Sequence, residues 1–209
     1  MKKFLTILLV MCICLFALST FAACGGGDDG NSDNGGDSDV VAGVTEEEWN
    51  DAKEEANFDN VTFQLNASFV DPAEYGDSVN FIKLAGDKVA MKEGVDGEYE
   101  TTDDADIIAS VKSVYVNTVL AIAEDFDKFA YDEANDCYKA SADIVYTVDV
   151  EGVNVTITAK NAVVTLDASS KIAKIACNMT QTYTISDETT SMVVDTEFTF
   201  SNYGTTVVE

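Results

Sequence analysis

Residues 173–185 read AKIACNMTQTYTI, and the alternation in this stretch decides the fold class. One parity carries Ala173, Ile175, Cys177, Met179, Tyr183 and Ile185. A period of two predicts a β-strand with one buried and one solvated face. A typical strand has about 5–6 residues, and a strand as long as this one must twist and coil. The stretch therefore predicts a strongly curved antiparallel sheet.

The same period recurs on both sides of this stretch. Further strands are expected over residues 61–69, 78–84, 88–93, 97–101, 144–150 and 153–158, and over a final run with Met192, Val194, Phe198 and Phe200 on one parity. Asp71-Pro72 ends the first of these runs. The pairs Gly86-Asp87 and Asp96-Gly97 indicate hairpin turns between the short strands.

A helix is expected before the first strand, over residues 46–57. Thr45 and Glu48 have the spacing of a capping box, in which each side chain satisfies a backbone N–H of the other residue. Val44 and Trp49 fall at the two positions of a hydrophobic staple. The three glutamates of the first turn also lie where the helix dipole favours negative charge.

A second, longer helix is expected over residues 104–125. Apolar residues recur there at intervals of three and four, at Ile107, Ile108, Val111, Val114, Tyr115, Val119 and Ile122. This spacing predicts a broad stripe that faces a core. A long curved sheet needs cover on its concave face. We therefore predict an α+β fold in which a long, curved antiparallel β-sheet, an open half-barrel, has two helices covering its concave face.

The first 23 residues have the form of a secretory signal. Lys2 and Lys3 precede an apolar run from Phe4 to Ala23. Phe21-Ala22-Ala23-Cys24 resembles the bacterial lipobox, which implies cleavage before Cys24 and a diacylglycerol thioether on that residue. We therefore predict a lipoprotein anchored on the extracytoplasmic face of the cell membrane. The alternatives are a signal peptide with a chance cysteine and a retained membrane span.

Residues 24–43 are expected to form a lipidated, flexible tether, and residues 44–209 a single domain. The tether is rich in Gly, Asp and Ser and offers almost nothing to bury, so it cannot offset the entropy of ordering. A calcium loop from Asp29 would need Gly at position 34 and Glu at position 40, where the chain has Asn34 and Val40.

The charge balance excludes several functions. The chain has 38 acidic residues, 12 lysines and arginines together, and no histidine, for a net charge of −26. Nucleic acid is excluded as a partner, because proteins bind it by neutralising phosphates. Histidine catalysis is excluded as well. We predict a protein that is not an enzyme and has no cofactor and no metal site.

Three acidic groups are candidate calcium sites, namely Asp103/Asp104/Asp106, Glu124/Asp125/Asp127 and Asp132/Glu133/Asp136. A helix N-terminus and exposed turns explain them more simply. Cys137 and Cys177 are expected to be free thiols rather than a disulfide, and without His or Arg nearby neither is expected to be a nucleophile.

The order of elements resembles the lipoprotein-carrier type represented by LolA, LppX and LprG, an open half-barrel of antiparallel strands with helices tucked inside. The Thr45-Glu46-Glu47-Glu48-Trp49 helix that leads into Asn60-Val61-Thr62 is also similar to many lipoproteins of clostridial-type bacteria. The resemblance implies a cleft between helices and sheet that takes a lipid or another apolar molecule.

Three function classes remain open; the third, an enzyme, would need perturbed carboxylates that converge in a cleft. The first is the binding of an apolar small molecule in that cleft, with a lining of Ile107, Val111, Val114, Tyr115, Ile122, Ile175, Met179, Tyr183 and Phe198. The alternative to this lining is a plain packed core. The second function is a surface module that meets a cationic protein partner through an acidic face or a sheet edge.

Overall fold

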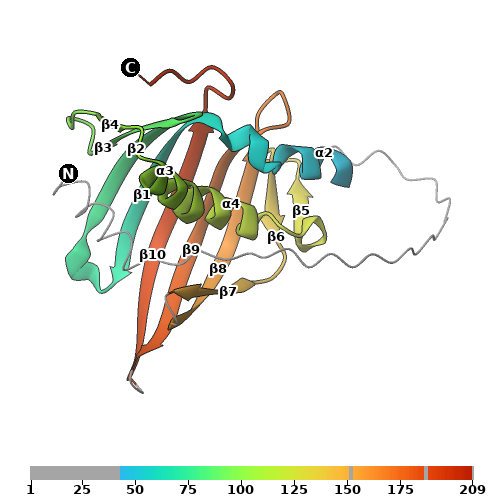
Figure 1. Cartoon of the computed structure of the whole chain (residues 1–209). Helices are drawn as coiled ribbons and strands as arrows, with labels where there is room; N and C mark the ends of the chain where they lie inside the picture. The colour runs from blue at the N-terminus through green and yellow to red at the C-terminus, as the bar shows by residue number, and fades with distance from the viewer. Residues whose placement is uncertain (1–42, 151–152, 186–187, 209) are drawn as a thin grey trace.

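The computed structural model of the chain describes residues 43–150, 153–185 and 188–208 (Figure 1). The predictions for the signal segment, for lipid attachment at Cys24 and for most of the tether concern residues 1–42, which lie outside the described residues.

The described residues form one antiparallel sheet of ten strands, in the order β4-β3-β2-β1-β10-β9-β8-β6-β5, with β7 also paired to β8. The strands are β1 Asn60–Asp71, β2 Asp77–Ala85, β3 Lys88–Glu93, β4 Glu100–Thr102, β5 Phe129–Asp132, β6 Cys137–Ala140, β7 Ile144–Val150, β8 Val153–Leu166, β9 Ile172–Ile185 and β10 Glu188–Ser201. The three strands from β8 to β10 have 14 residues each. The sheet is curved and does not close into a barrel, because the short strands β4 and β5 end it on its two sides.

Helix α2 covers Glu46–Ala52 and begins as the sequence predicts. Thr45 Oγ1 accepts from the backbone N–H of Glu48, and Glu48 Oε2 accepts from that of Thr45 at 2.8 Å. The backbone N–H and the hydroxyl of Thr45 both donate to Glu48 Oε2 and hold the pKa of Glu48 below its usual value. The helix ends earlier than predicted. The Asn57 side chain donates to the terminal carbonyls of Asp51 and Ala52, and the chain continues as the 3-10 turn Glu55–Phe58.

The long helix has three parts, α3 Ala105–Val111, a π-helical turn Lys112–Val116 and α4 Asn117–Ile122. Asp104 caps its N-terminus by accepting from the backbone N–H groups of Asp106 and Ile107. Three consecutive residues of the π turn, Val114, Tyr115 and Val116, are buried. A regular α-helix cannot bury three successive residues equally well on one face, since its positions are about 100° apart. The wider turn allows it.

The helices lie on one face of the sheet, which we call the inner face; the opposite face is the outer face. Helix α3–α4 crosses the middle of the long strands (Figure 1). The ring of Tyr115 meets that of Phe63 at 5.4 Å, and the indole N–H of Trp49 donates to the Ala123 carbonyl at 2.8 Å. These contacts fasten both helices to a single apolar core. The predicted fold class, a curved antiparallel sheet with two helices on one face, is confirmed.

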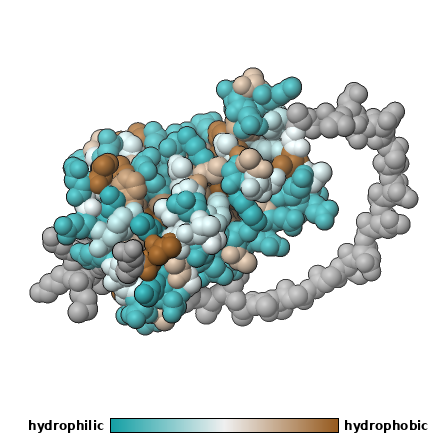
Figure 2. Space-filling model, turned by 90° about the horizontal axis from the view of Figure 1, so that it is seen from above, coloured by the Kyte–Doolittle hydropathy of each residue, from teal (hydrophilic) through white to brown (hydrophobic). Residues whose placement is uncertain are grey.

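The surface is mainly polar. Seen from above, apolar side chains gather in small separate patches among hydrophilic ones (Figure 2). One described helix, Ala105–Ile122, is long and apolar enough to cross a membrane by length and composition. Because its apolar stripe packs against the sheet, we interpret it as a core helix of the domain.

Candidate functional site

The nine residues predicted to line an apolar cleft lie on the inner face. Seven of them belong to the core cluster and are between 0% and 6% exposed: Val111, Val114, Tyr115, Ile122, Ile175, Met179 and Phe198. Ile107 is partly buried against this cluster, and Tyr183 is half-buried farther along β9. The structure therefore brings most of the predicted lining together as packed core between helix and sheet.

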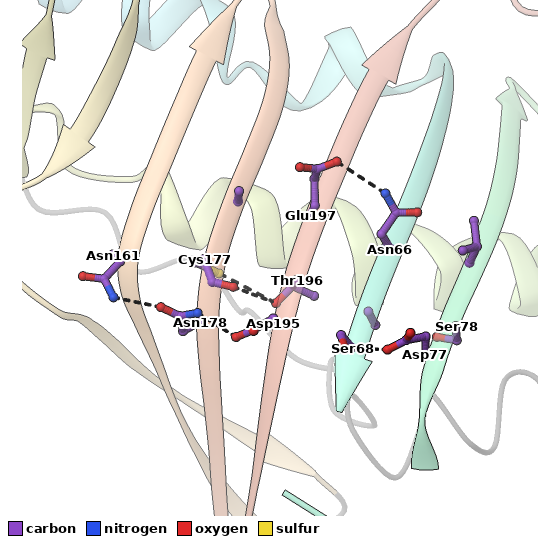
Figure 3. Close-up of a pocket in the computed structure, with 13 residues that line it drawn as sticks. Asn66, Ser68, Asp77, Ser78, Asn161, Cys177, Asn178, Asp195, Thr196 and Glu197 are labelled. Atoms are coloured by element: carbon purple, nitrogen blue, oxygen red, sulfur yellow. Dashed lines mark hydrogen bonds between the residues drawn. The ribbon is translucent and has the colours of Figure 1, made fainter. Parts of the chain in front are cut away.

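An open groove of about 570 Å³ lies elsewhere, on the outer face of the sheet. In Figure 3 the side chains of Ser68, Asn178 and Asp195 project from the side of the strands that faces away from the long helix. Its polar lining includes Asn66, Ser68, Asp77, Asn161, Asn178, Asp195 and Glu197. None of the nine predicted residues lines this groove.

Strand pairing places the groove side chains in two rows. Asp77, Ser68, Asp195 and Asn178 lie directly opposite one another across β2, β1, β10 and β9. Directly opposite residues project to the same face of a sheet, so these four side chains form one polar row. The adjacent row holds Asn66 opposite Glu197.

Hydrogen bonds fix the side chains of the first row. Asn161 Nδ2 donates to Asn178 Oδ1 at 2.8 Å, and Asn178 Nδ2 donates to Asp195 Oδ1 at 2.6 Å. The hydroxyl of Ser68 donates to Asp77 Oδ1 at 2.5 Å. The row therefore presents carboxylates whose positions are set by neutral amides and a hydroxyl (Figure 3).

Asn161 reaches the row because β8 is irregular there. The register of β8 against β9 shifts between Lys160 and Val163, and Asn161 has a φ of 52°. Bulges re-aim side chains, and Asn tolerates the left-handed region better than most residues. The bulge turns the Asn161 amide toward Asn178.

The groove is acidic. Lysines stand on its β8–β9 side, where Lys174 pairs with Glu197 at 2.5 Å and Lys160 pairs with Asp143 at 3.9 Å. Within the part of the chain that the structure describes, no lysine forms an ion pair with Asp77 or Asp195. These two carboxylates flank Ser68 from neighbouring strands. Lys160 continues the row opposite Asn178, but its ammonium pairs with Asp143.

The sequence did not point to these groove residues. Each lies on the polar parity of its strand, which is typical of a solvated face. The signal that gathers them is the register among β2, β1, β10 and β9, and one chain read alone does not contain it.

In each of the three acidic groups that are candidate calcium sites, at least one carboxylate has another partner. Asp104 caps α3, and Asp125 pairs with Lys128 at 3.4 Å. Asp132 accepts from Lys139 and Asn135, and the Lys139 hydrogen bond is the main cause that lowers its pKa to about 2. Asp136 accepts from the Tyr131 hydroxyl, which raises the pKa of Tyr131 to about 12.

Among residues 43–208, leaving out 151–152 and 186–187, no group of three or more His, Cys, Asp and Glu side chains is arranged to hold a metal ion. Cys137 and Cys177 are both free and buried. Burial raises the pKa of the Cys177 thiol to about 11, so this thiol is protonated at neutral pH and is a poor nucleophile.

Two comparisons with known proteins found no match. No family model matches the chain, and no curated protein matches its sequence.

Proposed function

We propose that the chain is a non-catalytic binding module, held on the extracytoplasmic face of the cell membrane by a lipid on Cys24, and that it binds a cationic protein segment in the outer-face groove. The observation that carries the proposal is the pair Asp77 and Asp195, two carboxylates without a lysine partner in the described structure, set in a groove of about 570 Å³.

The chemistry of the row suits ammonium groups. Strands lie about 4.7–4.9 Å apart, so Asp77 and Asp195, which are two strands apart, are separated by roughly 10 Å at their backbones. Ser68 and Asn178 add hydrogen-bonding groups beside them. A lysine-rich extended segment could place one side chain at each carboxylate. The net charge of −26 would steer such a partner toward the domain.

The apolar-cleft function has less support. Its predicted lining consists mostly of buried side chains in contact with one another, whereas the outer groove is open. The membrane anchor is a prediction from residues 1–24 of the sequence. It has its own test, because Cys24→Ser should release the protein from membranes. Retention of that variant in the membrane fraction, with an uncut N-terminus, would indicate a transmembrane anchor.

The test of the groove uses the full chain in nanodiscs of neutral lipid. A fluorescent peptide of alternating lysine and glycine should bind, and the matched glutamate-glycine peptide should not. Asp195→Asn should lower the affinity for the lysine peptide about threefold, the size expected for the loss of one exposed ion pair. Asp77→Asn with Asp195→Asn should weaken it further.

The control is Asp87→Asn, which removes the same charge from the exposed β2–β3 hairpin turn. It should leave the affinity nearly unchanged. Equal weakening by Asp87→Asn and Asp195→Asn would show that the peptide responds to net charge and not to the groove, and the proposal would fail.

A further inference from the structure

A buried glutamine lies on the inner face without a full set of hydrogen-bond partners. Gln181 on β9 is 3% exposed. Its Nε2 donates to Met179 Sδ at 3.6 Å, and a thioether is a weak acceptor. Its Oε1 is buried and has no hydrogen-bond partner among the described residues. The amide of Gln181 is therefore almost unsatisfied.

A second unsatisfied polar atom lies in the same row. Tyr146 on β7 is opposite Ile157 on β8, which is opposite Gln181, which in turn is opposite Met192 on β10. The Tyr146 hydroxyl is buried without a partner in the described structure, and burial raises the pKa of Tyr146.

Thr118 on α4 is close enough to the Tyr146 hydroxyl to offset a part of this rise in pKa. Its own hydroxyl donates to the Val114 carbonyl at 2.8 Å, so it has no proton left to donate to the Tyr146 oxygen. The inner-face row is therefore Tyr146, Ile157, Gln181 and Met192, with an unsatisfied oxygen on the first and third of these residues.

Proteins rarely leave buried polar groups without partners, since each such group has lost its hydration and gained nothing in return. Two such groups in one cross-strand row, surrounded by apolar side chains, indicate a site whose partner comes from outside the chain. Tyr146 and Gln181 are two strands apart, roughly 10 Å at their backbones, so one small molecule lying along the row could meet both.

We propose that this inner-face row binds an uncharged amphipathic molecule with a hydroxyl or primary amide head and an apolar chain. The head donates to Gln181 Oε1 and accepts from the Tyr146 hydroxyl, and the chain packs on Met179 and Met192. Methionine side chains are flexible, so they can move aside for a guest.

The head must be neutral for two reasons. A carboxylate has no proton to donate to Gln181 Oε1, and an ammonium would be buried among apolar groups without a counter-ion. The site shares Met179 with the apolar lining predicted from the sequence, but it differs from that prediction because a polar head decides the binding. It lies on the face of the sheet opposite the groove, so the two proposals succeed or fail separately.

The test uses NMR of the full chain in neutral-lipid nanodiscs, with methionine labelled by ¹³C at its methyl group. Met179 and Met192 flank Gln181, while Met91 on β3 is a buried control far along the sheet order. The probes are 1-octanol and sodium octanoate, which have chains of equal length. We expect octanol to shift the Met179 and Met192 signals saturably and to leave the Met91 signal unchanged. The affinity for octanoate should be at least tenfold lower than that for octanol.

Variants separate the hydrogen bonds from mere insertion into an apolar space. Gln181→Met should lower the affinity for octanol about 5- to 15-fold, as expected for the loss of a buried hydrogen bond. Tyr146→Phe should also lower this affinity. Gln64→Met makes the same change on the outer face and should have no effect.

Three results would overturn the proposal. The first is equal affinity for octanol and octanoate. The second is octanol binding that is unchanged by both Gln181→Met and Tyr146→Phe. The third is a crystal structure with an ordered water on Gln181 Oε1 that octanol does not displace.

Discussion

Replacement of the single tryptophan tests how the helices are fastened to the sheet. Trp49 is 1% exposed, and its ring lies 5.0 Å from Phe129, 5.1 Å from Tyr138 and 5.4 Å from Phe126. Its indole N–H also donates to the Ala123 carbonyl at the end of α4. One side chain therefore links α2 to α4, β5 and β6.

Trp49→Ala should lower the free energy of unfolding by about 3–5 kcal/mol, the range for removing a large aromatic residue from a core. The upper end is expected, because the Ala123 carbonyl also loses a hydrogen bond worth about 1 kcal/mol. Trp49→Phe keeps part of the packing, so it should lower the free energy of unfolding by about half as much as Trp49→Ala, or less. A total stability of about 5–15 kcal/mol makes the alanine variant marginal.

The assay is urea unfolding followed by far-UV circular dichroism, since the substitution removes the only tryptophan and with it the fluorescence signal. A loss below about 1 kcal/mol for Trp49→Ala would show that Trp49 does not hold the helices to the sheet, since only replacement of an exposed aromatic residue changes the free energy of unfolding so little.

Two further predictions concern stability. Gln181→Met should raise the free energy of unfolding in the absence of ligand by up to about 1–3 kcal/mol, because it removes a buried amide without adequate partners. Urea unfolding measures this change, with Gln64→Met as the control. A Gln181→Met variant that is less stable than the wild type would contradict the prediction. Asp132 has a folded-state pKa of about 2, below its unfolded value, so its contribution is present above about pH 4 and is lost as the pH falls toward 2. Asp132→Asn should therefore be less stable than the wild type near pH 6 and equal to it near pH 2, and an equal difference at both pH values in urea unfolding would show that the charge is not the cause.

The strands and caps could be predicted because their causes are local. The alternation over 173–185 places Cys177 and Met179 on one face whatever the strand pairs with. The capping box depends only on Thr45 and Glu48. Both features are set by residues close in sequence, and the structure shows them at the predicted positions.

The end of α2 and the π turn could not be predicted, because they depend on tertiary contacts. Asn57 ends the helix by folding back onto the carbonyls of Asp51 and Ala52. The π turn Lys112–Val116 buries three adjacent residues. A periodicity of three and four describes an average face and does not show where a helix widens to satisfy packing.

The groove could not be predicted from the sequence for a different reason. Asp77, Ser68, Asp195 and Asn178 come from four strands, and Ser68 is separated by more than 120 positions from its partner Asp195. Only the register brings them into one row. The same holds for Gln181, because only the register places it between Ile157 and Met192.

A map of where a cationic segment binds shows whether the outer-face groove is its site. Backbone amide shifts of the full chain in neutral-lipid nanodiscs, titrated with the lysine-glycine peptide, should change most at Ser68, Asn178 and Asp195 on the outer face. Inner-face residues such as Ile157 and Met192 should not move. Shifts spread evenly over the acidic turns, or concentrated at Asp87 and the β5–β6 turn, would show that the cationic segment does not bind in the groove.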